Sequence, residues 1–336
     1  MLTAGLCAAP FFAQELHFAD LGDFRLESGA SIHNCRLGYR TFGKLNAEKS
    51  NAVIFPTWFG GTTEDLTGLI GPGKLIDSSK YFLITVDALG DGVSTSPSNS
   101  ASQPHMKFPA IAIRDMVNSQ HQLARDVLHI PHLRAVMGIS MGGMQTFQWM
   151  VAYPDFMDCA IPIVGSPKLT SYDLLLWESG IHAIEADQNW KDGDYTSPPE
   201  AGLRTRADIE ALAIQTPAYR VAHTKPGDFR KFLDAEEDGS IHGFDANNWI
   251  RQAQAMMAHD VSRPFGDDMA KAAAAVKARV LFVVGLQDHM VNPTPALSFA
   301  ALLHAPTLEL NSDCGHLVTD CEQAKIAAAI ERFLAK

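Results

Sequence analysis

Short apolar runs alternate with segments of helical character along most of this chain. The runs are rich in Val, Ile, Leu and Phe, and most lack the in/out alternation of a strand with one wet face. Such runs are typical of strands buried on both faces of a parallel sheet. We assign strands within residues 51–58, 81–87, 134–137, 159–164, 279–284 and 307–310.

Helices are expected between these strands. Residues 111–129 carry apolar side chains at helical spacing with one polar interruption, and residues 144–153 and 323–334 are the other expected core helices. This alternation predicts an α/β fold whose mostly parallel sheet is covered on both faces. Near the N-terminus, residues 31–40 alternate as an antiparallel strand does, with residues 24–27 as the hairpin partner.

The regular alternation stops between residues 166 and 275. This stretch is polar, shows helical patterns, and contains several large aromatic residues and prolines. We therefore predict a core of residues 14–165 and 276–336, with residues 166–275 inserted as a helical lid over the carboxyl edge of the sheet. The alternative is a second domain with its own core.

Composition narrows the function classes. A chain of 336 residues is long enough for one large domain or a core plus an insertion. The formal net charge of −11 argues against nucleic acid as a partner. No apolar stretch reaches the ~18–20 residues of a membrane span. The five cysteines form no metal-binding pattern, and no metal or cofactor is implied.

The first 13 residues are apolar, uncharged and rich in small side chains, and polar sequence begins at Gln14. This is typical of the apolar region and cleavage zone of a secretory signal peptide, although the basic start is missing. We therefore expect an exported protein. The alternative is a cytoplasmic protein whose apolar N-terminal segment packs on the surface.

The cysteines divide by their surroundings. Cys7 would leave with the signal peptide, and Cys35 and Cys159 stand in apolar segments as expected core residues. Cys314 and Cys321 are seven residues apart and flank a histidine. In an exported protein they could form a disulfide that staples this loop, although spacing alone does not fix the pairing.

The chemistry centres on the sequence Gly138-Ile139-Ser140-Met141-Gly142, where a strand runs directly into a helix. This is the pattern of a nucleophile elbow, a tight turn that presents a serine hydroxyl above the edge of a sheet. The two glycines allow the backbone to approach itself closely. By itself the pattern also fits a glycine-rich turn with an incidental serine.

A serine nucleophile needs a base and an acid, and these follow the elbow in the chain. Asp288 comes directly after the strand at residues 279–284, and His316 lies in the loop after the last strand. We expect Ser140 to attack an acyl carbonyl, His316 to carry its proton, and Asp288 to orient the histidine. His289 is a competing base, but it stands beside the acid on the same loop.

An oxyanion hole needs two backbone N–H groups. One is expected from Met141, the residue after the nucleophile. The other is expected from Phe59, or else from Trp58, in the glycine-rich loop after the first long strand.

Residues 37–317 resemble the homoserine O-acetyltransferase family of α/β-hydrolase-fold enzymes. The matching segments are residues 68–74, 113–117, 140–145 and 244–247. The resemblance implies acyl transfer through Ser140 with Asp288 and His316, and a helical lid that mediates homodimers.

The chain departs from the family where the amino-acid substrate would bind. The family's lid arginine for the homoserine carboxylate has no aligned counterpart, so Arg204 and Arg206 are the candidates. Leu317 replaces the acidic residue expected after the catalytic histidine, and the loop that contains Trp58, a further candidate contact, is also changed.

We therefore expect hydrolysis of a small acyl ester on an acyltransferase-like scaffold. An O-acyltransferase that uses an acyl-CoA donor is the second hypothesis, and a non-catalytic binding protein on a hydrolase fold is the third. Export would favour water as the acceptor, because acetyl-CoA is confined to the cytoplasm.

Overall fold

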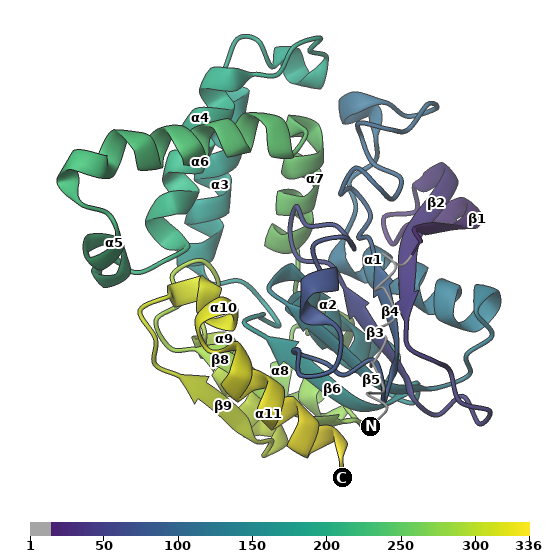
Figure 1. Ribbon diagram of the computed structural model, residues 1–336. Coiled ribbons are helices and arrows are strands. Elements are labelled where there is room, and N and C mark those ends of the chain that lie inside the picture. Colours follow the sequence, from purple (N-terminus) through teal and green to yellow (C-terminus); the bar gives the residue numbers. More distant parts are fainter. Residues whose placement is uncertain (1–14) are drawn as a thin grey trace, which may run out of the picture.

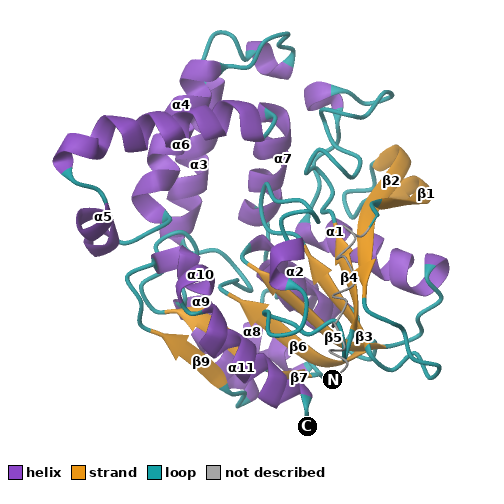
Figure 2. Cartoon of the chain, viewed as in Figure 1, coloured by secondary structure: helices purple, strands orange, loops and turns teal. Residues whose placement is uncertain are grey.

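A nine-stranded sheet forms the centre of the computed structural model, which describes residues 15–336 (Figures 1 and 2). The strand order is β1-β2-β4-β3-β5-β6-β8-β9, with β7 beside β6. The first pairings, β1 with β2 and β2 with β4, are antiparallel, and the others are parallel. The strands are β1 His17–Arg25, β2 Ser31–Phe42, β3 Ala52–Pro56, β4 Phe82–Val86, β5 Leu133–Ile139, β6 Met157–Ile163, β7 Arg279–Val280, β8 Phe282–Gly285 and β9 Thr307–Leu310.

The predicted strands are present, and most of them are buried; the exception is β9, in which only Leu310 is buried. All five residues of β3 are buried, as are five consecutive residues of β5 from Ala135 to Ile139. Of the predicted hairpin partner at residues 24–27, only residues 24 and 25 are in a strand, where they end the longer β1. Polar exposed positions between the buried residues of β1 hid its true length from a search for apolar runs. The predicted signal peptide, residues 1–13, lies outside the described residues.

Helices cover both faces of the sheet. The helices α1 (Ile113–Gln122), α2 (Met141–Ala152), α8 (Met269–Ala274) and α9 (Thr294–Leu303) bury apolar residues in one hydrophobic cluster, and α11 (Gln323–Leu334) does so in the other. The helix predicted over residues 111–129 changes form after Gln122. There the Leu128 N–H donates to the Leu123 carbonyl at 2.9 Å, a π-helical turn.

The lid contains α3 (Ser171–Glu185), α4 (Glu200–Ala213), α5 (Pro217–His223), α6 (Phe229–Gly243) and α7 (Ala246–Met257). It lies at the upper left in Figure 1, away from the chain's C-terminus. Its two stems meet in an antiparallel bridge between Lys168 and Asp260. The chain thus returns to the core before residue 275, and α8 packs against α9 as a core helix. The short, alanine-rich α8 carries no pattern that separates it from lid helices.

The lid shares its hydrophobic cluster with one face of the sheet instead of forming a core of its own. Trp177, Leu203 and Trp249 of the lid belong to the same cluster as Ile54 of β3 and Phe147 of α2. The predicted α/β fold with a mostly parallel sheet and an inserted helical lid is therefore confirmed. None of the helices in residues 15–336 is both long and apolar enough to cross a membrane.

Candidate active site

Ser140 lies at the turn between β5 and α2, with φ +57° and ψ −118°. A non-glycine residue in this region is strained and is held there by its surroundings. A Cβ on Gly138 would collide with the Gly142 carbonyl, and a Cβ on Gly142 would lie 2.7 Å from the Pro56 carbonyl oxygen. Both glycines are thus required by close backbone approach, as the elbow pattern predicts.

The structure brings Ser140, His316 and Asp288 into one hydrogen-bonded chain. His316 Nε2 lies 2.8 Å from Ser140 Oγ, and His316 Nδ1 lies 2.6 Å from Asp288 Oδ2. The three residues are only 8%, 7% and 5% exposed, respectively. Because a carboxylate only accepts, Nδ1 carries the proton and Nε2 is free to accept the serine hydroxyl. His289, the competing candidate for the base, is exposed, whereas His316 is buried.

The second oxygen of Asp288 fixes the orientation of the carboxylate. Asp288 Oδ1 accepts from the backbone N–H groups of Met290 at 2.8 Å and Val291 at 2.9 Å. With both oxygens engaged, the carboxylate has a single favoured rotamer. This arrangement holds the imidazole so that it can remove and return a proton at Ser140 Oγ.

The two expected oxyanion donors lie at the start of α2 and in the loop after β3. Three other N–H groups of this loop are engaged: Thr57 donates to Val86 O at 3.0 Å, Gly60 to Gln252 Oε1 at 3.0 Å, and Gly61 to Trp58 O at 3.1 Å. Among the described residues, the N–H groups of Phe59 and Met141 have no acceptor. Both are therefore available to a negative oxygen, and so is the N–H of Trp58, the alternative donor.

Two buried glutamines to which the sequence analysis assigned no role hold this loop. Gln252 of α7 accepts from the Gly60 N–H at 3.0 Å and donates to the Leu89 carbonyl at 3.2 Å. Gln145 of α2 donates to the Thr57 carbonyl at 3.0 Å. Both side chains are fully buried. Gln145 stands within the matching segment of the elbow, but Gln252 lies 192 residues from Gly60, and no local pattern marks it.

A cavity of about 610 Å³ opens over Ser140 and His316. Aromatic and aliphatic side chains form much of its wall, and Phe59 packs against Trp177 of the lid with ring centroids 4.9 Å apart. Its charged lining residues are all acidic: Asp65, Glu210 and Asp320. No Lys or Arg lines the cavity within the part of the chain that the structure describes. The other lining residues are Trp58, Gly68, Leu69, Ile139, Ile214, Met290, Leu317, Thr319 and Gln323.

Of the three candidate substrate contacts, Trp58 lines the cavity and the two arginines do not. Arg204 pairs with Glu237 at 2.7 Å and with Asp238 at 3.2 Å. Arg206 pairs with Glu210 at 2.6 Å, and its guanidinium lies 5.4 Å from the ring of Trp249. Both guanidinium groups are therefore engaged by acidic partners within the lid, and neither lines the cavity.

The His316 loop is anchored to the lid. The His316 N–H donates to the Ile214 carbonyl at 2.9 Å, and the Thr216 hydroxyl donates to the Asp313 carbonyl at 2.8 Å. Gly315 has φ +61°, and a Cβ there would lie 3.1 Å from the Ile214 carbonyl oxygen. Only glycine fits this approach without strain. The lid segment at residues 214–216 thus positions the backbone of the histidine.

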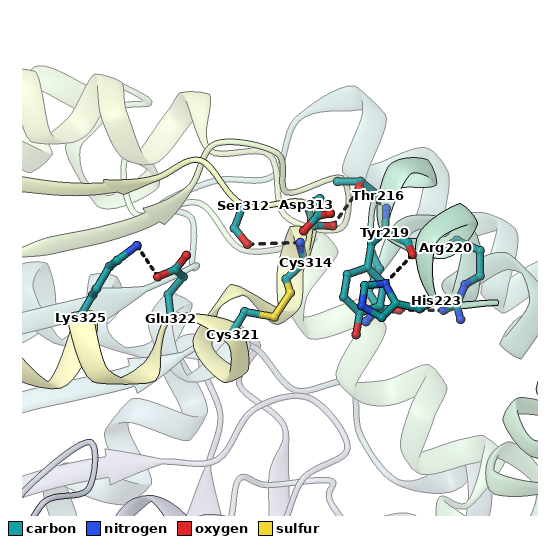
Figure 3. Close-up of a disulfide and its surroundings, with 11 residues drawn as sticks. Thr216, Tyr219, Arg220, His223, Ser312, Asp313, Cys314, Cys321, Glu322 and Lys325 are labelled. Atoms are coloured by element: carbon teal, nitrogen blue, oxygen red, sulfur yellow. Dashed lines mark hydrogen bonds and ion pairs between the residues drawn. A yellow bond between two sulfur atoms is a disulfide. The ribbon is translucent and has the colours of Figure 1, made fainter.

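Cys314 and Cys321 form a disulfide across this loop (Figure 3). Cys35 and Cys159 are buried and unpaired, as expected for core residues. In residues 15–336 there is no group of three or more His, Cys, Asp or Glu side chains placed to hold a metal ion.

The family model of the alpha/beta hydrolase fold matches residues 53–320. An ethyl acetate hydrolase of Pseudomonas veronii is 32% identical over 339 residues, which cover 97% of each chain. A homoserine O-acetyltransferase of Trichormus variabilis is 33% identical over 317 residues, which cover 87% of this chain and 86% of the relative. A solved structure of the acetyl esterase MekB superposes with a TM-score of 0.89, at 31% identity and with 96% of each chain covered. Hydrolases and acyltransferases alike therefore match nearly the whole chain.

Proposed function

Because this chain belongs to the alpha/beta hydrolase fold family, in the group that contains homoserine O-acetyltransferases and related esterases, we propose that it hydrolyses small neutral esters through an acyl-enzyme on Ser140. The observation that carries the proposal is the hydrogen-bonded chain from Ser140 through His316 to Asp288 beneath an open cavity. The proposed substrates are acetyl and similar short acyl esters, in keeping with the names of the hydrolase relatives.

The proposed mechanism uses groups already in contact. Ser140 Oγ attacks the ester carbonyl while His316 Nε2 takes its proton, and Asp288 stabilises the imidazolium that forms. The Phe59 and Met141 N–H groups donate to the oxyanion, each typically worth ~3 kcal/mol in the transition state. His316 then returns the proton to the leaving alcohol. Water then attacks the acyl carbonyl while His316 Nε2 takes its proton, and the bond to Ser140 Oγ breaks. The carboxylic acid leaves, and His316 returns the proton to Ser140 Oγ.

The charge of the cavity favours a neutral ester with water as acceptor over an acyl-CoA with homoserine. Asp65 and Asp320 would repel the CoA phosphates, Glu210 is paired with Arg206, and Arg204 is engaged by Glu237 and Asp238. Like charges brought together in a partly desolvated site are costly. A carboxylate-bearing acceptor would therefore bind weakly here.

The test compares hydrolysis and transfer in one preparation. Ethyl acetate and p-nitrophenyl acetate are assayed with and without homoserine, and acetyl-CoA plus homoserine is assayed separately. We expect ester turnover, no acetyl-homoserine, and a loss of at least ~10⁴-fold in kcat for Ser140→Ala. The matched control is Ser179→Ala, on the exposed side of α3. Faster acetyl-homoserine formation than hydrolysis, or unchanged turnover in Ser140→Ala, would overturn the proposal.

We further propose that the protein is exported. The apolar start of the chain supports this, as does the disulfide, because disulfides persist in oxidising compartments. N-terminal sequencing of the protein recovered from the periplasm or medium should then give a chain that begins near residue 14. An uncleaved chain found only in the cytoplasm would contradict export.

We also propose that the lid pairs two copies of the chain. Large apolar side chains are exposed on it, with Leu212 and Val221 each 81% exposed. Exposed apolar patches are typical of interaction surfaces. Light scattering should give twice the chain mass, and Leu212→Glu with Val221→Glu should give a monomer. A wild-type monomer at assay concentrations would refute this.

A further inference from the structure

We propose that the Cys314–Cys321 disulfide is a positioning element that keeps His316 in reach of Ser140, so that catalysis requires this bond and folding does not. The inference rests on the proposed function, because it concerns the same base. The disulfide joins residues seven apart in sequence with Cα atoms 6.6 Å apart. The segment that it closes supplies His316, Leu317, Thr319 and Asp320 to the cavity.

The two halves of this segment are held differently. The first half is tied to the lid through the His316 N–H and the Asp313 carbonyl. The second half contains the four-residue helix α10 (Val318–Cys321), which has no side-chain cap. Its backbone bond, from the Glu322 N–H to the Val318 carbonyl at 2.9 Å, is local. The disulfide therefore connects α10, which the buried Val318 attaches to the core, to the half that the lid anchors (Figure 3).

The side chain of Val318 explains why the fold should survive without the disulfide. Val318 is fully buried and belongs to the hydrophobic cluster that α11 covers. Its burial keeps the segment attached to the core after the bond is broken. What is lost is the restraint on His316, whose bonds to Ser140 and Asp288 are 2.8 and 2.6 Å long. A displacement of ~1 Å in such a constellation can cost about 10²-fold in rate.

The bond is open to reduction from one side. Cys321 is exposed, whereas Cys314 is 3% exposed. A thiolate of dithiothreitol attacks the Cys321 sulfur, the S–S bond breaks, and Cys314 leaves as a thiolate that takes up a proton. The second thiol of the reagent then displaces Cys321. The reagent is oxidised to its cyclic disulfide, and the protein gains two thiols.

The experiment uses the full-length protein in its oxidised form, after reduction with dithiothreitol, and as the double variant Cys314→Ala with Cys321→Ala. We expect kcat for p-nitrophenyl acetate to fall by ~10- to 100-fold with KM changed less than about threefold. Reoxidation of the reduced wild type should restore kcat, and dithiothreitol should not affect the double variant further. Cys35→Ala, which removes a buried unpaired thiol, is the matched control.

Two further measurements separate positioning from general stability. Circular dichroism should show a fully folded protein with Tm lowered by only a few degrees. The downfield proton resonance of the His316 Nδ1–H bond to Asp288 should weaken or broaden on reduction.

The outcomes that overturn the inference are distinct from failure of the proposed function. An unchanged kcat and an unchanged resonance after thiol counting shows complete reduction would refute it. So would a loss of kcat that only tracks the unfolded fraction. If the oxidised wild type hydrolyses no ester at all, the proposed function fails, and the resonance alone decides whether the disulfide positions His316.

Discussion

Gln252 shows how a single lid residue can reach the catalytic loop. Its amide bonds at once to the Gly60 N–H and to the Leu89 carbonyl, so it links α7 with the loops after β3 and β4. The Phe59 N–H, a proposed oxyanion donor, is the preceding donor on the same loop. Loss of the amide would leave the Gly60 N–H unsatisfied and free the loop to shift.

Substitution of Gln252 should therefore lower catalysis more than stability. We expect Gln252→Ala to reduce kcat by ~10-fold or more through a misplaced oxyanion donor, with a smaller change in KM. Gln254→Ala, on the same helix and bonded to Arg251, is the control and should leave kcat unchanged. Equal kcat values for the wild type and Gln252→Ala would show that the loop holds its position without the lid amide.

The residues of the catalytic chain were predictable because each stands at the end of a recognisable strand. Ser140 follows β5, Asp288 follows β8, and His316 follows β9. The role of Gln252 was not predictable, because its hydrogen bond joins residues 192 apart and no local sequence pattern indicates it. The pairing of the two candidate arginines was hidden for a related reason: sequence does not reveal that acidic side chains of the lid hold them away from the cavity wall.

Close packing between elements sets the direction of α2. A Cβ on Gly165, just after β6, would lie 2.7 Å from the Gly143 Cα, and a Cβ on Gly143 would lie 2.8 Å from the Ile163 carbonyl oxygen. Helix α2 therefore starts in direct backbone contact with the end of the neighbouring strand. The strands themselves were predictable from apolar runs. This contact and the return of the chain near Asp260 were not, because both depend on packing between elements that are distant in sequence.

A methyl group at this contact should force the elements apart. We expect Gly165→Ala to destabilise the fold by ~1–3 kcal/mol, and to lower kcat because Ser140 moves with α2. Gly239→Ala is the matched substitution, since it lies within α6 and the new Cβ would have no atom within 4 Å apart from the backbone of its own helix. It should stabilise the lid helix by about 0.5–1 kcal/mol. The free energy of unfolding in urea and kcat are measured for both variants. Equal effects of the two substitutions on these quantities would contradict this account.

At the scale of the whole molecule, the stability of the fold depends on a buried histidine at the base of the lid. His259 is 5% exposed, its Nε2 has no hydrogen-bond partner among the described residues, and it precedes the Lys168–Asp260 bridge. Burial lowers the pKa of His259 from 6.5 to about 4. The folded protein therefore keeps this ring neutral where an unfolded chain would charge it.

This pKa difference gives a signed prediction. Between pH 6.5 and about 4 the unfolded chain binds a proton at His259 and the folded protein does not, so the free energy of unfolding falls as the pH falls. Over that window the group costs roughly 3 kcal/mol. Buried carboxyls with raised pKa, such as Asp87, act in the opposite sense.

Comparison with a variant isolates the histidine. The loss of stability between pH 7.5 and 4.5 in urea should be smaller in His259→Gln than in the wild type. His289→Gln, at an exposed site, should behave as the wild type does. The same pH dependence in all three proteins would rule out His259 as the source.

The paired stems of the lid have a consequence for how this molecule can change. The chain leaves the sheet and returns to it at one antiparallel bridge, Lys168 with Asp260. The segment between these two residues is therefore an insertion whose two ends have fixed positions on the core. A different inserted segment could replace this one without a change in the path of any strand. The new segment would change the lid side of the cavity wall. It would also have to replace the Ile214 carbonyl, which accepts from the His316 N–H, and the Gln252 amide, which accepts from the Gly60 N–H. A lid exchange that changes substrate specificity will therefore keep the catalytic rate only if the new lid also makes these two hydrogen bonds.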